Sequence, residues 1–259
     1  MKKQVLFDIF ESIAPLSLSE EWDNCGTQID LGKTEINKVY VAMEITEDVI
    51  RAAADCGADM IITHHPMLLP SFELSSVSES DVIGRQTIEL IKNGIEVCSL
   101  HTCYDAAPGG MNDQFCSMLN LQDVRVLAGN ILRIGRLPEP VPFSEFEKLT
   151  ADVLDHPLGA KSIGNKDKII RTVAVCTGSG GDLWKQAADA GADVYVTGEV
   201  KHHEAGYIKQ TDMCCIAAGH SGTEWIFVPC MEKQFGLLTM GQIEIYKTES
   251  HQEPFLRRI

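Results

Sequence analysis

An α/β fold made of two related halves that pack around a shared cleft is predicted by three features of the sequence. Strand-like apolar runs alternate with helical patterns, which is typical of sheets with parallel strands. A stretch of 25 residues near the start of the chain is repeated 134 residues later. Histidines follow three of the strand-like runs, where the loops of such sheets build functional sites.

The composition is that of a globular protein with an acidic surface. The chain has 259 residues, of which 44% are hydrophobic, so it can bury a substantial core. Its net charge of −15 argues against a nucleic-acid partner, because phosphate binding needs clustered Lys and Arg. The sequence shows neither a membrane-spanning apolar stretch nor a signal-peptide pattern, and we expect a cytoplasmic protein without membrane contact. The nine cysteines include no C-x-x-C pair and are expected to be reduced.

The first half contains a regular succession of helices and strands. Apolar residues at helical spacing predict a first helix over 5–13. Thr46 is suited to cap a second helix, and Gly57 is suited to end it. A third helix is expected to stop at Gly94. The predicted helices cover 5–13, 46–56 and 80–92, and the predicted strands cover 38–42, 60–63 and 95–100.

The repeat aligns residues 39–63 with residues 173–197. Ten of the 25 positions are identical, including the pattern Ala-Ala-Asp-x-Gly-Ala-Asp at 53–59 and at 187–193. Average composition would give about two identities by chance. Two homologous halves explain this agreement; the alternative is that a helix, a glycine cap and a strand are a common solution that was reached twice.

The boundary between the halves is expected near residue 131. Residues 131–137 are strand-like, and Pro138, Pro140 and Pro142 predict a rigid breaker before a helix over 144–154. We therefore expect halves at 1–130 and 131–259. No low-complexity linker separates them, so they are expected to form one compact unit.

Imidazole side chains collect at the ends of the strand-like runs. His64 and His65 follow the run at 60–63, and Pro66 ends strand pairing, so both rings can project from the strand end. His101 and His220 follow two later runs. A single histidine pair is more often a polar loop feature, but the agreement of three strand ends favours a metal site.

Two carboxylates accompany these histidines. Asp105 lies four residues after His101, and Glu224 lies four residues after His220. A carboxylate can bridge two cations about 3.5–4 Å apart. Mixed histidine and carboxylate ligands suit Zn, Fe, Mn, Co or Ni, and the pattern does not choose among them. As alternatives, Asp105 is a turn residue and Glu224 is an acid near a helix N-terminus.

Further polar residues are candidates for proton transfer. His101 is a metal ligand, a neighbour that orients Asp105, or a general base. Glu199 replaces, in the second half, a histidine of the first, and His202 follows on the next segment. Both are candidates for proton transfer or substrate contact; the alternative is an ordinary solvated helix start.

A glycine-rich turn over 177–182 resembles a phosphate cradle. It lacks the third glycine of the dinucleotide motif and the Gly-Lys-Ser/Thr of a P-loop. The alternative, which we favour, is a tight turn between a strand and a helix.

Six short motifs along the chain together resemble one known family. They are Glu21-Trp22-Asp23-Asn24-x-Gly26, Thr63-His64-His65-Pro66, His101-Thr102-x-x-Asp105, Gly109-Gly110-x-Asn112-Asp113, Thr197-Gly198-Glu199-x-Lys201-His202-His203 and Gly219-His220-x-x-Thr223-Glu224. In order and spacing they resemble the Nif-three-like dinuclear metal proteins, also described as GTP cyclohydrolase 1 type 2 homologues. The similarity spans nearly the whole chain, which looks like the short form without a domain inserted between the halves.

This resemblance implies a duplicated α/β unit that assembles into a toroidal homohexamer. It also implies two divalent metal ions per subunit, in clefts that face the central cavity. The metal ligands that it implies are His64, His65, Asp105, His220 and Glu224. The chain departs from the family at 67–71, where Met-Leu-Leu-Pro-Ser replaces an aromatic and basic stretch, and at 26–30, which is more polar. Substrate contacts made by the 67–71 loop are therefore not carried over.

The function that follows is a dinuclear metal-dependent hydrolase acting on a small molecule. Two cations bridged by Asp105 or Glu224 would activate a water near neutral pH and polarise the bond to be broken. The resemblance suggests the purine ring of GTP as substrate, and a phosphate ester or a cyclic amide fits the same chemistry. The alternatives are a non-catalytic metal-binding protein for regulation or trafficking, and an assembly protein that metal staples together.

Overall fold

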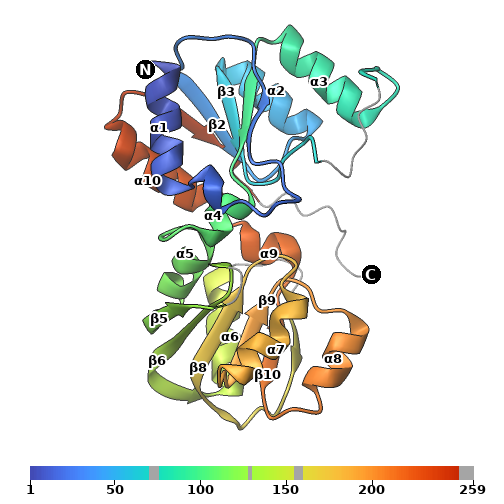
Figure 1. Cartoon of the computed structure of the whole chain (residues 1–259), viewed down its shortest axis with the longest axis vertical. Helices are drawn as coiled ribbons and strands as arrows, with labels where there is room; N and C mark the ends of the chain where they lie inside the picture. Colours follow the sequence, from blue (N-terminus) through green and yellow to red (C-terminus); the bar gives the residue numbers. More distant parts are fainter. Residues whose placement is uncertain (70–75, 128–129, 155–159, 251–259) are drawn as a thin grey trace. The chain divides into compact units, whose positions relative to one another are not determined.

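The computed structural model describes residues 1–69, 76–127, 130–154 and 160–250, and the chain divides into two compact units. The first unit comprises Met1–Ala107 and Phe227–Ser250, and the second comprises Pro108–Ile226. Each unit has a sheet with helices on both faces (Figure 1). The predicted duplicated α/β class is thereby confirmed. Among the helices described, none has the length and apolarity that a bilayer span requires.

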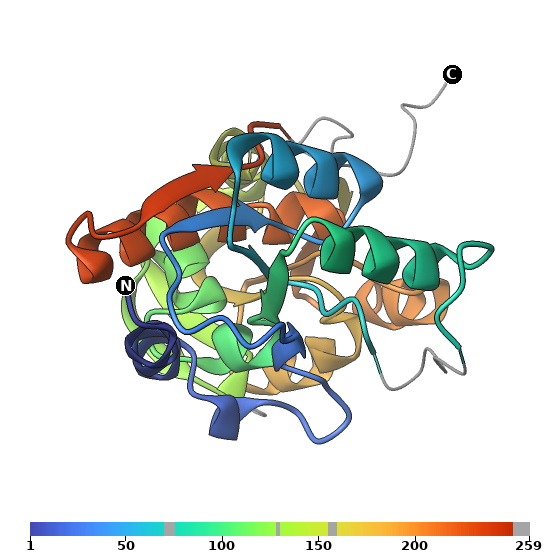
Figure 2. The same ribbon diagram turned by 90° about the horizontal axis from the view of Figure 1, so that it is seen from above.

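The first unit is built on a five-stranded sheet. Its elements are α1 (Lys3–Ile13), η1 (Leu16–Leu18), β1 (Gly26–Ile29), β2 (Lys38–Ala42), α2 (Glu47–Cys56), β3 (Met60–Thr63), α3 (Val82–Lys92), β4 (Glu96–Ser99), α4 (Thr102–Ala106), α10 (Phe227–Thr239) and β11 (Glu244–Lys247). The strand order is β1-β4-β3-β2-β11, and only β1 runs antiparallel to its neighbour. Helices α1 and α10 lie on one face and α2 and α3 on the other, as both views show (Figures 1 and 2).

The residues of α2 and of the two sheet faces explain this packing. Thr46 caps α2 by accepting a hydrogen bond from the Val49 N–H at 3.1 Å. Alternate strand residues point to opposite faces, and Ile61 packs with Val49 under α2 and α3. On the other face, Phe10 of α1 and Phe235 of α10 stack their rings with centroids 5.5 Å apart. Both faces are apolar, as a sheet covered on both sides requires.

The second unit is built on a six-stranded sheet. Its elements are α5 (Met111–Met118), β5 (Gln122–Val126), β6 (Arg133–Pro142), α6 (Phe143–Leu154), β7 (Lys161–Ile163), β8 (Ile169–Cys176), η3 (Gly181–Leu183), α7 (Trp184–Asp189), β9 (Val194–Thr197), α8 (His202–Ile208), β10 (Cys214–Ala217) and α9 (His220–Glu224). The strand order is β5-β6-β8-β9-β10-β7, with β8, β9 and β10 parallel.

The predicted repeat has the same geometry in both units. Strands β2, β3 and β4 are adjacent and parallel, as are β8, β9 and β10. Asp59 accepts hydrogen bonds from the N–H groups of residues 37 and 38, and Asp193 accepts them from residues 171 and 172. Gly57 and Gly191 end the preceding helices at φ +70° and +83°. The shared sequence pattern therefore encodes the same turn twice.

Each unit has a histidine followed four residues later by an acid. When the two sheets are aligned by their strand registers, these two motifs are offset by one residue. Met60 pairs with Glu96, and the equivalent Val194 pairs with Cys214. By this register His101 corresponds to a glycine of the second unit, so that His101 caps α4 whereas His220 is the first residue of α9.

The proline-rich breaker expected at 138–142 is wrong. β6 runs through it to Pro142, and its ladder with β8 has a register shift between Arg136 and Val141. Pro138 and Pro140 fall within the shift, where their lack of an N–H breaks no ladder hydrogen bond. The strand ends where Phe143 begins α6.

The compact units are not the same as the halves expected at 1–130 and 131–259. β5 pairs with β6, which places residues 122–126 in the second unit, and β11 pairs with β2, which returns residues 244–247 to the first. The halves therefore remain a prediction about the sequence repeat. Of the departing loop, Pro70 and Ser71 lie outside the described residues.

Candidate metal centre

The first unit presents His64 and His65 at the carboxyl end of β3. Both backbone N–H groups donate to the Met43 carbonyl, at 3.1 and 2.8 Å, so the chain turns sharply after the strand. The Thr63 hydroxyl donates to the His65 carbonyl at 2.8 Å and supports the same turn. His64 is fully buried and His65 is partly buried. The strand end thus holds both imidazoles in defined places, as the sequence predicted.

The hydrogen bond of His64 determines which ring nitrogen can bind a metal. Its Nδ1 lies 3.0 Å from the Leu100 carbonyl oxygen, which can only accept. Nδ1 therefore carries the proton, and Nε2 keeps the lone pair that a metal needs. The Asp105 carboxylate lies on the Nε2 side, with Oδ1 at 3.7 Å.

His101 is held in a similar way by Asp23. Its Nδ1 lies 2.9 Å from Asp23 Oδ1, while Asp23 Oδ2 accepts hydrogen bonds from the N–H and the hydroxyl of Thr102. Burial opposes the charge on Asp23, but the hydrogen bonds from His101 and Thr102 outweigh it and hold its pKa well below the usual range. The carboxylate is therefore charged and orients the His101 ring. Sequence reasoning did not select Asp23, although it lies in one of the six motifs.

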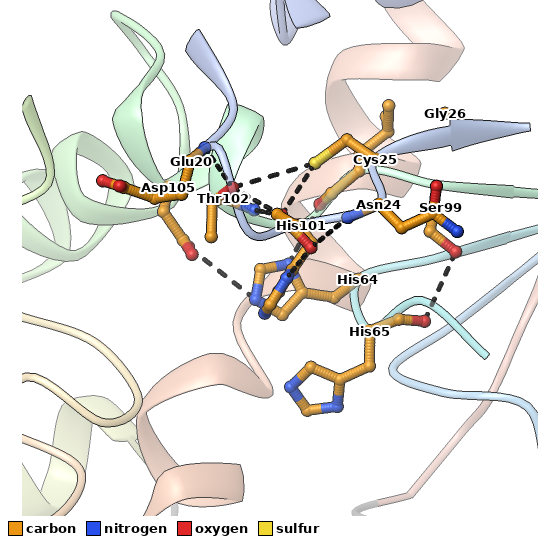
Figure 3. Close-up of polar contacts among 12 residues, drawn as sticks. Glu20, Asn24, Cys25, Gly26, His64, His65, Ser99, His101, Thr102 and Asp105 are labelled. Carbon is orange, nitrogen blue, oxygen red and sulfur yellow. Dashed lines mark hydrogen bonds and ion pairs between the residues drawn. The ribbon is translucent and has the colours of Figure 1, made fainter. Parts of the chain in front are cut away.

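Three imidazoles meet at this end of the first sheet (Figure 3). The ring centroids of His64 lie 5.1 Å from those of both His65 and His101. One ligand nitrogen of each lies within 4.8 Å of those of the other two. This grouping is compatible with His101 as a ligand or as an immediate neighbour of one.

Asp105 completes the acidic side of this cluster. It is the fourth residue of α4, and its carboxylate faces His64 in the close-up (Figure 3). Its side chain is 14% exposed. A partly buried carboxylate beside imidazoles is a donor set that suits divalent first-row metals.

The second unit presents His220 and Glu224 on α9. His220 Nε2 lies 2.9 Å from Glu224 Oε2, and the Glu224 side chain is only 4% exposed. Thr223 anchors this short helix by accepting a hydrogen bond from the Gly178 N–H at 2.9 Å. The residues therefore form a histidine and carboxylate pair on one helical turn.

Glu199 also contacts this pair. Its Oε2 lies 3.5 Å from His220 Nδ1 and accepts a hydrogen bond from the Ser179 hydroxyl at 2.7 Å. The arrangement resembles that of His101, with a carboxylate on Nδ1. His202, in contrast, is exposed at the start of α8. The structure thus gives Glu199 a defined contact with His220.

The glycine-rich turn at 177–182 leaves space for the carboxylate of Glu224. Gly178 has φ +64°, and a side chain there would collide with Glu224 Oε1. Gly180 is held by its carbonyl, which accepts a hydrogen bond from the Tyr195 hydroxyl at 2.5 Å. The turn provides space for a carboxylate, which favours the tight-turn interpretation over a phosphate cradle.

The donor groups of each unit fit a divalent metal of the Zn, Fe, Mn, Co or Ni type. They are imidazoles, of which His64 and His101 are oriented through Nδ1, and the largely buried carboxylates of Asp105 and Glu224. All nine cysteines are free thiols, and none belongs to these groups. A calcium site would require oxygen ligands throughout, which this donor set does not provide.

Comparison with known proteins assigns the chain to a family. Residues 1–254 match the model of the family described as Duf34/NIF3 (NGG1p interacting factor 3). The chain belongs to the NIF3 family. A "GTP cyclohydrolase 1 type 2 homolog" of Clostridium perfringens is 30% identical over 98% of this chain and 99% of its own length. The "NGG1-interacting factor 3" of Saccharomyces cerevisiae is 32% identical over 91% of this chain and 89% of its own.

Solved structures of NIF3-related proteins share the fold. A Bacillus cereus protein related to NIF3 superposes with a TM-score of 0.91 at 22% identity, covering 99% of both chains. Reduced HcgD from Methanocaldococcus jannaschii superposes with a TM-score of 0.81 at 26% identity, covering 96% of this chain and 98% of its own. The duplicated NIF3 fold therefore extends over essentially the whole chain.

Proposed function

We propose that this chain is a metal-dependent hydrolase that binds two divalent ions and acts on a small molecule. The observation that carries the proposal is the meeting of three imidazoles, from His64, His65 and His101, at one end of the first sheet. His64 and His101 are each held through Nδ1, which leaves Nε2 of His64 as a ligand atom and Nε2 of His101 as a neighbour of the proposed ligands. When bound, the metal ions would supply a Lewis acid and an activated water. The proposed ligands are His64, His65, Asp105, His220 and Glu224.

The chain's own residues would hold these ligands and move protons. The Leu100 carbonyl fixes the His64 tautomer, and Glu199 is placed to do the same for His220. The Asp23 carboxylate orients the His101 ring through Nδ1, which leaves Nε2 as the atom that could accept a proton. His202 remains a candidate for contact with substrate, since it is exposed beside the segment that carries Glu199.

The proposed substrate is a nucleotide or another small molecule with a hydrolysable ring or ester. Several relatives are named for GTP cyclohydrolase, which makes GTP the first compound to examine. A net charge of −15 repels a triphosphate, so the metal ions would have to offset this charge at the site. We also propose a homohexameric ring, whose mass in solution would be six times the 28.5 kDa of the chain.

The test combines metal analysis with an activity screen. Protein purified without added metal is analysed for bound elements, and hydrolysis of nucleotides and phosphoesters is then measured with each metal restored. His64→Ala and Glu224→Ala remove one proposed ligand from each unit. Both variants should lose bound metal, and their hydrolysis should fall to background. His203→Ala changes an exposed histidine outside the ligand set and should retain both.

Two results would contradict parts of the proposal. Wild-type metal content in both His64→Ala and Glu224→Ala would refute the ligand assignment. Full metal content without turnover of any compound would refute the hydrolase, and would favour a protein that binds metal for regulation or trafficking.

A further inference from the structure

A pocket of the second unit is lined in part by β5, the edge strand of its sheet. Figure 1 shows the place of this strand. The volume of the pocket is about 460 Å³, within the range of sites for small molecules. Among its lining residues are Asp123 and Arg125 from β5, Gly135 and Arg136 from β6, and Thr172 from β8. None of these residues has a part in the proposed hydrolase.

A β-bulge shapes this pocket. Gln122 pairs with Arg136 and Arg125 pairs with Ile134, so that two residues of β5 oppose Gly135 alone. Asp123, the first of the two, has φ +53°, a conformation that Asp tolerates better than most residues. A Cβ at Gly135 would come within 3.1 Å of β5 atoms, so a side chain here would require β5 to shift by a few tenths of an ångström. Bulges of this kind commonly redirect side chains near functional sites.

The pocket carries two arginines on a chain that is acidic overall. The sequence has 37 acidic and 22 basic residues, and Arg51, Arg85 and Arg133 each form a salt bridge. Arg125 and Arg136 have no such partner within the part of the chain that the structure describes. Two unpaired guanidinium groups on one pocket form a local cationic site on an acidic protein.

The pocket lies at the opposite strand ends from the metal-site residues of the same unit. Ala190 and Gly191, which also line it, come before β9, whereas Glu199 follows β9. His220 likewise follows β10. In a parallel sheet, residues that precede the strands lie at the amino ends of the strands, and residues that follow them lie at the opposite, carboxyl ends. The pocket is therefore separate from the His220 and Glu224 pair.

We propose that this pocket binds a small organic phosphate that carries hydroxyl groups. The guanidinium groups of Arg125 and Arg136 would hold the phosphate, because their planar forks match its oxygens. Asp123, the acid among the lining residues, would accept hydrogen bonds from the hydroxyl groups. Free phosphate would use only the first of these contacts and should bind more weakly.

The experiment measures binding of glycerol 3-phosphate and of inorganic phosphate to the full chain by calorimetry. Arg125→Gln and Arg136→Gln should each weaken glycerol 3-phosphate binding roughly tenfold to a hundredfold, as expected for hydrogen bonds to a charged group. Asp123→Asn should weaken the organic phosphate and not inorganic phosphate. Arg171→Gln removes the same charge from an exposed position on β8 outside the lining and should change binding less than twofold.

A second measurement requires no variant. Phenylglyoxal modifies accessible arginines, and glycerol 3-phosphate should protect Arg125 and Arg136 but not Arg171, as read by peptide mass spectrometry. Binding at the metal centre would not produce this local protection. Absence of protection, or an equal loss of binding in Arg171→Gln, would overturn the proposal. Unchanged affinity in Asp123→Asn would overturn the hydroxyl contact.

Discussion

Substitution of Gly178 by Ala is predicted to displace the Glu224 carboxylate and thereby the metal. Gly178 has φ +64°, and the added methyl group would occupy the place of Glu224 Oε1. Glu224 is buried and cannot move outward without losing its 2.9 Å contact with His220. The change thus alters a proposed ligand through its neighbour and leaves every ligand in the sequence.

The expected loss of stability has two parts. Ala in the left-handed region costs roughly 1–2 kcal/mol. Loss of the 2.9 Å contact between Glu224 and His220 adds roughly 1.5–3 kcal/mol, as is usual for a polar contact to a charged group. Gly178→Ala should therefore lower the free energy of unfolding by about 2.5–5 kcal/mol. Gly191→Ala is the matched control, because Gly191 has φ +83° and no described atom lies within 4 Å of the added carbon.

The assay is urea unfolding followed by circular dichroism, together with the metal content of each purified variant. Gly191→Ala should lose only the roughly 1–2 kcal/mol of backbone strain and should keep its metal. Gly178→Ala should lose more stability and most of the metal. Equal unfolding free energies and equal metal contents in the two variants would refute the role that we assign to this turn.

Other predictions concern the repeated turn, a helix cap and the support of His101. Asp59→Asn and Asp193→Asn should each cost roughly 1.5–3 kcal/mol in urea unfolding, since each carboxylate accepts two backbone hydrogen bonds; a cost in only one of them would contradict equivalent turns. Burial opposes the charge of Asp59, but Lys33 and two backbone N–H groups lower its pKa on balance. The contribution of Asp59 to the free energy of unfolding is therefore present above pH about 4 and is lost as the pH falls further. Asp59→Asn should flatten the acid side of the curve of stability against pH. Thr46→Ala should cost about 1 kcal/mol, and an unchanged unfolding midpoint would contradict its role as a cap. Asp23→Asn should lower hydrolysis roughly tenfold to a hundredfold at unchanged metal content, because Asp23 orients His101, the proposed proton acceptor, and unchanged hydrolysis would exclude this orientation.

Local chemistry made much of the fold predictable. The Thr46 cap, the Gly57 stop and the strand at 60–63 appear in the structure as expected because hydrogen bonds among neighbouring residues specify them. The pattern at 53–59 recurs at 187–193 with the same hydrogen bonds, so the same turn could be predicted in both units. His64 and His65 at the end of β3 followed from the same regularity.

Features that depend on distant pairing were not predictable. The prolines of β6 indicated a breaker, and only the register shift against β8 explains why a strand accepts them. The pairing of β11 with β2 joins residues about 200 positions apart, which no local pattern encodes. Asp23 was missed for the same reason, since its partner His101 lies 78 residues away.

The most direct test of the account is the anomalous X-ray scattering of crystals of metal-loaded protein. Two metal peaks per chain are expected, each coordinated by residues of the set His64, His65, Asp105, His220 and Glu224. A single peak, or peaks bound by other residues, would contradict it.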